Sequence, residues 1–293
     1  ALVGSVVYFG PRVLLVCGLS VAGCVFFEWG YRKVMKLDNT VGDLSAVVTG
    51  LLLAFVCPPS IPYWTILIGD FFAIVVVKQL FGGIGKNFMN PALAARAFLF
   101  SWPVIMTTWV QPGQWPSLFG SNVDAVTAAT PLANLHQNLL PTESLTTLFL
   151  GKTGGCLGET SALLLLLGGL YLVLRRVIRL RIPLSYLGTV ALLTLLFPRG
   201  NDPLLWMASQ LLSGGLMLGA WFMATDYVTS PVTGWGQILY GVGCGCITVL
   251  IRYFGSYPEG VSYAILTMNA CVVLLDKVGL PRRFGTARKE AVQ

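Results

Sequence analysis

Nine long apolar segments dominate this chain and leave few folds open to it. They are separated by polar turns and run near residues 12–29, 44–57, 62–80, 90–106, 160–174, 183–197, 203–224, 235–253 and 260–276. Only 11% of the 293 residues are charged, whereas a soluble domain averages about 25%. So few charges cannot cover a water-facing surface, and we therefore expect an all-α, polytopic membrane protein.

Several of these segments are short for a membrane helix. The second has about 14 residues, which is roughly 21 Å of helix against a hydrocarbon core of about 30 Å. Short segments bounded by proline and glycine are typical of broken or re-entrant helices, whose free backbone groups line a site. We therefore expect discontinuous helices in this chain.

The basic residues predict the orientation of the chain in the membrane. When successive segments alternate in direction, most Lys and Arg residues fall on one side, and the positive-inside rule makes that side cytoplasmic. The polar loop at 107–159 then lies on the outer face, between a first membrane half at 1–106 and a second at 160–276. The basic tail at 277–293 and the carboxyl terminus are cytoplasmic.

A faint internal repeat links the two halves. The pair Phe81-Gly82 recurs as Phe254-Gly255, with a tryptophan and a glycine at similar offsets before each pair. The matching segments begin on opposite sides, so the repeats are inverted, an arrangement that commonly places a ligand or ion site between halves. We expect ten helices in two inverted five-helix repeats, with the first helix ahead of residue 1. Chance similarity between apolar segments is the alternative.

A run of small and hydroxyl residues at 123–132 stands out in the outer loop. It contains Asp124 and the pattern Thr127-Ala128-Ala129-Thr130, followed by a proline. No bulky side chain crowds Thr130 in the sequence, which leaves its hydroxyl approachable by a large group. A threonine-rich turn ahead of the proline is the alternative interpretation.

A second stretch, residues 81–92, forms a glycine-rich turn on the cytoplasmic side. Gly83 permits close approach of a partner, and Asn90 is a good cap for a helix that begins at Pro91. Asn87 lies between them. The spacing is not that of a Walker A loop, and a tight turn without a ligand is the interpretation that spacing alone favours.

A third stretch, residues 222–231, closes the seventh apolar segment. Thr225 and Asp226 lie there at the membrane boundary. These side chains either cap a helix and accept backbone hydrogen bonds, or hold a cation or the edge of a flavin ring.

Two charges fall inside apolar segments. Asp70 lies near the middle of the third segment, and Arg96 lies one or two turns inside the fourth. A charge at the bilayer centre costs at least about 2.5–3.5 kcal/mol, so each side chain is expected to face protein, water or a cofactor. We expect a mutual ion pair, with ion coupling or a flavin-facing Arg96 as alternatives.

Other classes of site are disfavoured. The net charge of +7 comes from basic residues at helix ends, so it does not indicate nucleic-acid binding. The seven cysteines form no CxxC pair, and none lies near His136, the only histidine. A metal or iron–sulfur site within this chain alone is therefore not expected.

The three stretches, in this order and spacing, resemble the D subunits of Rnf complexes, bacterial ferredoxin:NAD oxidoreductases that pump ions. The B subunits of Na+-pumping NADH:quinone oxidoreductases are similar and form the first alternative. The resemblance spans nearly the whole chain. The short amino terminus favours the Rnf type, and a channel or solute transporter without a cofactor is an alternative of another class.

The resemblance implies a flavoprotein subunit of the bacterial cytoplasmic membrane. FMN would be bonded through its phosphate to Thr130, with Thr127, Asp124 and Ala129 shaping the loop. It also implies a noncovalent riboflavin, a flavin transferase for maturation, and partner subunits that include an outer-face flavoprotein and hold the ferredoxin and NAD modules. Ala128 departs from the family pattern, which usually has glycine there.

Overall fold

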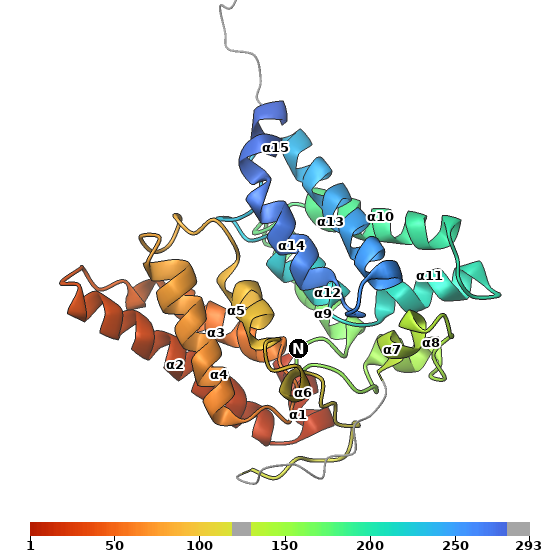
Figure 1. Ribbon diagram of the computed structural model, residues 1–293, viewed down its shortest axis with the longest axis horizontal. Helices are drawn as coiled ribbons and strands as arrows, with labels where there is room; N and C mark the ends of the chain where they lie inside the picture. Colours follow the sequence, from red (N-terminus) through yellow and green to blue (C-terminus); the bar gives the residue numbers. More distant parts are fainter. Residues whose placement is uncertain (119–129, 280–293) are drawn as a thin grey trace, which may run out of the picture.

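The computed structural model describes residues 1–118 and 130–279, and every regular element within these two stretches is a helix (Figure 1). The first half comprises α1 (Leu2–Phe9), α2 (Arg12–Val34), the short 3-10 helix η1 (Val41–Asp43), α3 (Ser45–Phe55), α4 (Tyr63–Phe71), its π-helical continuation η2 (Phe72–Gln79), α5 (Pro91–Leu99) and α6 (Pro103–Met106).

Two short helices, α7 (Pro131–His136) and α8 (Leu145–Leu150), connect this half to the second. The second half comprises α9 (Ala162–Leu174), α10 (Arg181–Leu196), α11 (Pro203–Leu212), α12 (Leu216–Leu218), its π-helical continuation η3 (Gly219–Met223), α13 (Gly234–Phe254), α14 (Val261–Ala270) and α15 (Val272–Gly279). Each of the nine predicted apolar segments therefore contains a helix.

Few of the described helices are long enough to cross a membrane on their own. Within residues 1–118 and 130–279, α2 and α13 can each cross a membrane by length and composition, and counting each of two bent pairs as one span raises the number of candidate spans from two to four. The bend between α11 and the α12–η3 helix is 65°, and that between α14 and α15 is 61°. Gly214, whose φ is +70°, allows the first break. The prediction of short and broken helices is confirmed.

Helix caps explain where the central helices begin. Asn90 caps α5, because its side-chain oxygen accepts hydrogen bonds from the backbone N–H groups of Ala92 at 3.0 Å and Leu93 at 3.3 Å. Pro91 occupies the first turn of α5, where no backbone donor is needed. The predicted cap and helix start are therefore confirmed.

Glycines set how closely the longest helices pack. A methyl group at Gly50 of α3 would lie 2.8 Å from the backbone oxygen of Ser20 on α2, so these two helices are in backbone contact. In the second half, a methyl group at Gly245 of α13 would lie 2.6 Å from the Cβ of Thr189 on α10. Glycine at these two positions therefore allows each pair of helices to pack closely.

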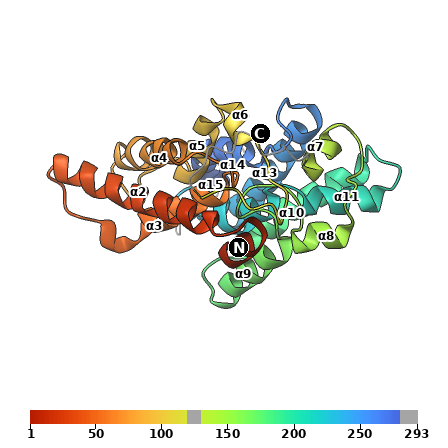
Figure 2. The ribbon, with the colours of Figure 1, turned by 90° about the horizontal axis from the view of Figure 1, so that it is seen from below.

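The two halves meet at the centre of the molecule. In both views α2 and α11 lie at opposite ends, while α5 and α14 lie between them (Figures 1 and 2). α5 contacts α14 directly, and α14 also contacts η3. Polar side chains carried by α5 therefore face the second half of the chain.

Candidate functional site

Thr130 stands at the start of α7 and serves as its cap. Its hydroxyl oxygen accepts a hydrogen bond from the backbone N–H of Ala133 at 3.2 Å, and Pro131 occupies the first helical position. This bond orients the side chain, while the hydroxyl hydrogen remains available for another interaction. The Thr-Pro sequence thus holds a hydroxyl in a defined position at a helix end.

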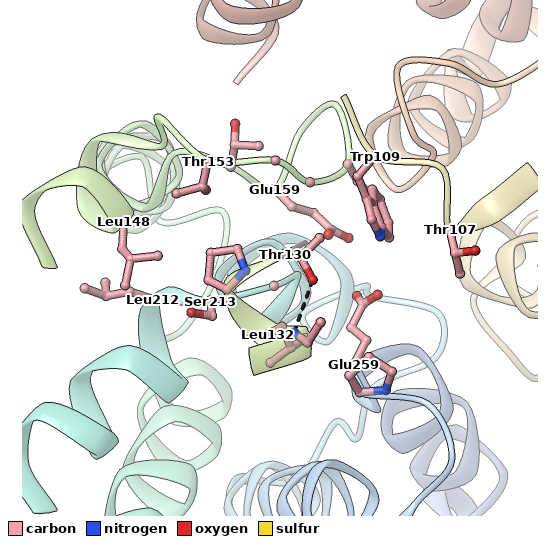
Figure 3. Close-up of a pocket in the computed structure, with 18 of the residues that line it drawn as sticks. Thr107, Trp109, Thr130, Leu132, Leu148, Thr153, Glu159, Leu212, Ser213 and Glu259 are labelled. Atoms are coloured by element: carbon pink, nitrogen blue, oxygen red, sulfur yellow. Dashed lines mark hydrogen bonds between the residues drawn. The ribbon is translucent and has the colours of Figure 1, made fainter. Parts of the chain in front are cut away.

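A cavity of about 250 Å³ opens beside Thr130 (Figure 3). Aromatic side chains of Phe100, Trp109 and Tyr257 contribute to its wall, and so do the small residues Gly154 and Gly155. Mostly apolar walls with a few polar groups are typical of small-molecule sites. The cavity therefore suits a planar aromatic group anchored at the threonine.

Two carboxylates border the same cavity, and both point toward the space around Thr130 (Figure 3). Arg96 of α5 links them: its Nη1 lies 2.9 Å from Glu159 Oε1 and 2.6 Å from Glu259 Oε1, and its Nη2 donates to Glu259 Oε2. The guanidinium group is buried. The cluster joins the first half of the chain to the loops that precede α9 and α14.

Burial raises the pKa of the Glu159 carboxyl to about 8, although the Arg96 guanidinium acts in the opposite direction. The nearby Glu259 carboxylate also raises this pKa. The proton affinity of Glu159 is therefore sensitive to the charge of its surroundings.

A second cavity, of about 590 Å³, lies between the halves near the glycine-rich turn. It brings together Asn87 and Asn90 from one predicted stretch with Thr225 and Asp226 from the other. Asn90 also reaches the second half, since its amide nitrogen lies 3.5 Å from the backbone oxygen of Met223. Residues far apart in the sequence thus form one polar wall.

Some polar side chains in the wall of this inner cavity already form hydrogen bonds within their own segment. Thr225 donates to the backbone oxygen of Trp221 at 2.8 Å, and Thr229 donates to Asp226 Oδ2 at 3.0 Å. Burial raises the pKa of Asp226, although the hydrogen bond from Thr229 acts in the opposite direction. A partly buried carboxyl of this kind can bind a cation or accept a hydrogen bond from a ligand.

Two of the residues predicted to form a flavin or ion environment, Gly83 and Arg96, do not line the inner cavity. Gly83 has a φ of +92°, and a methyl group there would lie 2.9 Å from Arg32 Nη2, so it is required by the turn itself. Arg96 instead lies behind the wall of the Thr130 cavity, where it pairs with Glu159 and Glu259. The predicted loop residues Asp124, Thr127, Ala128 and Ala129 fall outside the described residues.

The sequence pattern that defines the family described as NQR2, RnfD, RnfE matches residues 1–285, which is nearly the whole chain. The chain belongs to the NQR2, RnfD, RnfE family. The family resemblance predicted from the three stretches is therefore confirmed.

Relatives in the NQR2, RnfD, RnfE family include components of translocating complexes. The chain is 48% identical to the D subunit of the Na(+)-translocating ferredoxin:NAD(+) oxidoreductase complex of Acetobacterium woodii, over 97% of this chain and 86% of that protein. It is 44% identical to the corresponding component of a proton-translocating complex from Clostridium ljungdahlii, over 98% and 88%. The D subunit of an ion-translocating oxidoreductase complex from Stutzerimonas stutzeri is 42% identical, over 93% and 83%.

The predicted ion pair between Asp70 and Arg96 is wrong for this NQR2, RnfD, RnfE family member. Asp70 Oδ1 accepts from Ser20 at 2.6 Å and from Cys24 Sγ at 3.3 Å, both on α2. α4 turns this carboxyl toward α2, whereas α5 turns Arg96 toward α14. Adjacency along the chain did not fix which face each helix presents.

Glu159 and Glu259, the true partners of Arg96, were missed by sequence analysis. A signal was present, because the predicted topology places both acids at the outer ends of apolar segments, on the same side as Thr130. Acidic residues beside membrane segments are uncommon and face protein or water. The topology therefore contained enough information to group them.

Proposed function

We propose that this chain is the D-type subunit of an ion-translocating ferredoxin:NAD(+) oxidoreductase complex and relays electrons through FMN bonded to Thr130. The names of the relatives from Acetobacterium woodii and Clostridium ljungdahlii support the complex. The observation that carries the cofactor assignment is the position of Thr130, whose oriented hydroxyl lies at the edge of an aromatic-walled cavity.

The residues present fit a flavin. The wall combines aromatic rings for stacking with glycines that leave room for a flat ring, and Ser213 contributes a buried hydroxyl with no hydrogen-bond partner among the described residues. Bound FMN supplies one- and two-electron transfer. A phosphoester to Thr130 fixes the phosphate end and leaves the ring free to occupy the cavity.

We further propose that the inner cavity takes a noncovalent flavin, riboflavin, or else an ion. Its volume of about 590 Å³ lies within the range of small-molecule pockets. The amides of Asn87 and Asn90 can pair with the polar edge of a flavin ring, and Asp226 can accept from a ring N–H or a ribityl hydroxyl. The junction of both halves is where inverted repeats commonly place a ligand.

The proposed topology is ten helices in two inverted repeats, with the Thr130 loop on the outer face of the bacterial cytoplasmic membrane. The packing supports it, because α2 contacts α3 and α4 while the matching α10 contacts α11 and α13. The chain would work with other membrane and peripheral subunits, including an outer-face flavoprotein, after a flavin transferase has modified it. A quinone-reducing complex is the second candidate, since the family description includes NQR2.

Flavin fluorescence of the denatured subunit tests the cofactor assignment. The complex is produced together with its flavin transferase, separated under denaturing conditions and viewed under ultraviolet light. Thr130→Val should abolish the fluorescence. Thr130→Asn should abolish it as well, because asparagine preserves the helix cap but offers no hydroxyl for the phosphoester.

Thr153→Val is the matched control, because Thr153 borders the same cavity. It should leave the fluorescence unchanged. Fluorescence that survives both Thr130 substitutions would refute the assignment, and a wild-type subunit without fluorescence would favour a channel or transporter.

A further inference from the structure

Glu159 and Glu259 approach each other unusually closely at the wall of the Thr130 cavity. A methyl group at Gly215 would lie 2.5 Å from Glu159 Oε1 and 2.6 Å from Glu259 Oε1, so both oxygens pack against one glycine. The same two oxygens accept from a single nitrogen, Arg96 Nη1. The glycine thus creates the space in which two carboxyl groups meet.

One guanidinium group cannot fully compensate two carboxylates in a buried site. Two carboxylates that accept from the same nitrogen repel each other, which disfavours ionisation of both at once. Such pairs commonly hold one proton between them. Glu159 is the more deeply buried member, with 5% of its side chain exposed against 16% for Glu259. Glu259 therefore connects the pair to the open side of the cavity.

Among the described residues around the pair, no second cation reaches the two carboxyl groups to balance their charge in place of this proton. A neighbouring buried guanidinium, that of Arg252, donates to the backbone oxygens of Gln210 and Ser213, and reaches Glu259 only through its backbone oxygen at 3.4 Å. Ser262 lies 3.3 Å from Arg96 Nη1. Among the described residues, the other titratable groups that act on the cluster are thiols and phenols, namely Cys57, Cys156, Tyr186 and Tyr263.

An independent feature points to a ligand at this wall. The hydroxyl of Ser213 is buried, borders the cavity and has no hydrogen-bond partner among the described residues. An unsatisfied buried hydroxyl is costly unless a ligand or water satisfies it. The wall of the Thr130 cavity therefore carries an unsatisfied hydroxyl in addition to the carboxyl pair.

We propose that Glu159 and Glu259 together form an exchangeable proton site beside Thr130, and that the pair takes up a proton when the flavin is reduced. The second part rests on the proposed function, whereas the first part stands on the geometry of the pair alone. Two of the relatives are subunits of complexes that translocate Na(+) or protons. A site whose protonation changes with flavin reduction is therefore relevant to how electron transfer drives ion movement.

When bound, FMN would accept one electron from a redox centre of another subunit, and its reduction would add one negative charge to the cavity. A hydronium ion in the outer-face water would then give its proton to a carboxylate oxygen of the pair, where an O–H bond forms and a water molecule is left behind. The charge of the site is restored, and no bond within the protein breaks.

Infrared spectroscopy of the complex tests the first part without FMN at Thr130. The subunit carries Thr130→Val, and the carboxylic acid C=O band is titrated from about pH 6 to about pH 9. We expect a protonated band that disappears as pH rises. Glu159→Gln should remove the part of this band that belongs to the pair, while Glu143→Gln, outside this cavity, should leave that part unchanged.

If the Glu159→Gln complex does not assemble, Glu259→Gln and the titration of the Thr130→Val complex still decide the matter. A carboxylic acid band whose pH titration is the same with and without these Gln substitutions would overturn the proton site. This result is independent of whether FMN is attached.

Redox titration of the complex with native Thr130 tests the second part. The midpoint potential of the flavin on this subunit should fall as pH rises, and Glu159→Gln should flatten that dependence. An unchanged slope in Glu159→Gln would refute the redox link while leaving the proton site intact. Absence of covalent flavin would refute the proposed function instead.

Discussion

The buried ion pair between Glu28 of α2 and Lys78 of η2 gives a sharp prediction of stability. Lys78 Nζ lies 2.7 Å from Glu28 Oε2 and 2.5 Å from Ser45 Oγ, and both charged side chains are almost fully buried. Lys78→Met removes these contacts and leaves a buried carboxylate with Thr40 as its donor, at 2.7 Å.

Loss of one member of a buried pair costs about 3–5 kcal/mol. With an unfolding entropy of about 2.1 cal/mol/K per residue, each kcal/mol corresponds to roughly 1.6 °C for a chain of 293 residues, so the unfolding temperature should fall by roughly 5–8 °C. The assay is thermal unfolding in detergent at one fixed scan rate. Lys33→Met is the matched control, because Lys33 is exposed on α2 and lies over the Trp29 ring at 4.6 Å. An exposed contact of that kind contributes about 0.5–1 kcal/mol.

The double variant Glu28→Gln with Lys78→Met separates lost charge pairing from lost packing. It leaves no unpaired charge, so it should be more stable than Lys78→Met alone, by up to about 3 kcal/mol of coupling. The reasoning fails if Lys78→Met unfolds within two or so degrees of the Lys33→Met control, or if the double variant is the less stable one.

Two further outcomes concern helix contact and pH. Gly50→Ala should destabilise the protein by about 1–3 kcal/mol, since its methyl group would collide with the Ser20 backbone. Gly18→Ala, with no neighbour within 4 Å, should instead be neutral or stabilising in the same unfolding assay; equal effects would contradict the close backbone contact between α2 and α3. Burial raises the pKa of Glu159 from 4.5 to about 8. At pH values between these two, its carboxyl is therefore protonated in the folded protein and ionised in the unfolded chain. The unfolding temperature should therefore fall as pH rises through that window, and Glu159→Gln should remove this contribution; an identical pH profile in the variant would count against a raised pKa.

The sequence predicted local features of the fold well, because they depend on neighbouring residues. Apolar runs located the nine helical segments, and the Asn-Pro pair at residues 90–91 located the start of α5. The Thr-Pro pair at 130–131 is likewise the start of a helix, α7. The π-helical stretches η2 and η3 had no signal in the apolar pattern, since they alter the hydrogen-bond register without changing the composition.

Contacts between segments were less accessible to sequence reasoning. The stretches holding Asn90 and Asp226 were singled out separately, and only the structure brings them to one cavity. Arg96 was assigned the wrong partner because its rotation about α5 is set by packing against α14. The carboxyl pair at Glu159 and Glu259 depends on the close approach at Gly215, which no local pattern encodes.

Peptide mass spectrometry of the digested subunit tests the central claim most directly. The complex is produced with its flavin transferase, and the peptide that contains Thr130 is fragmented to locate any added mass. We predict a mass increase equal to FMN less one water, as a phosphoester requires, positioned on Thr130 and absent from the Thr130→Asn subunit. Flavin mass on another residue, or an unmodified Thr130 peptide from a fully matured complex, would contradict the account.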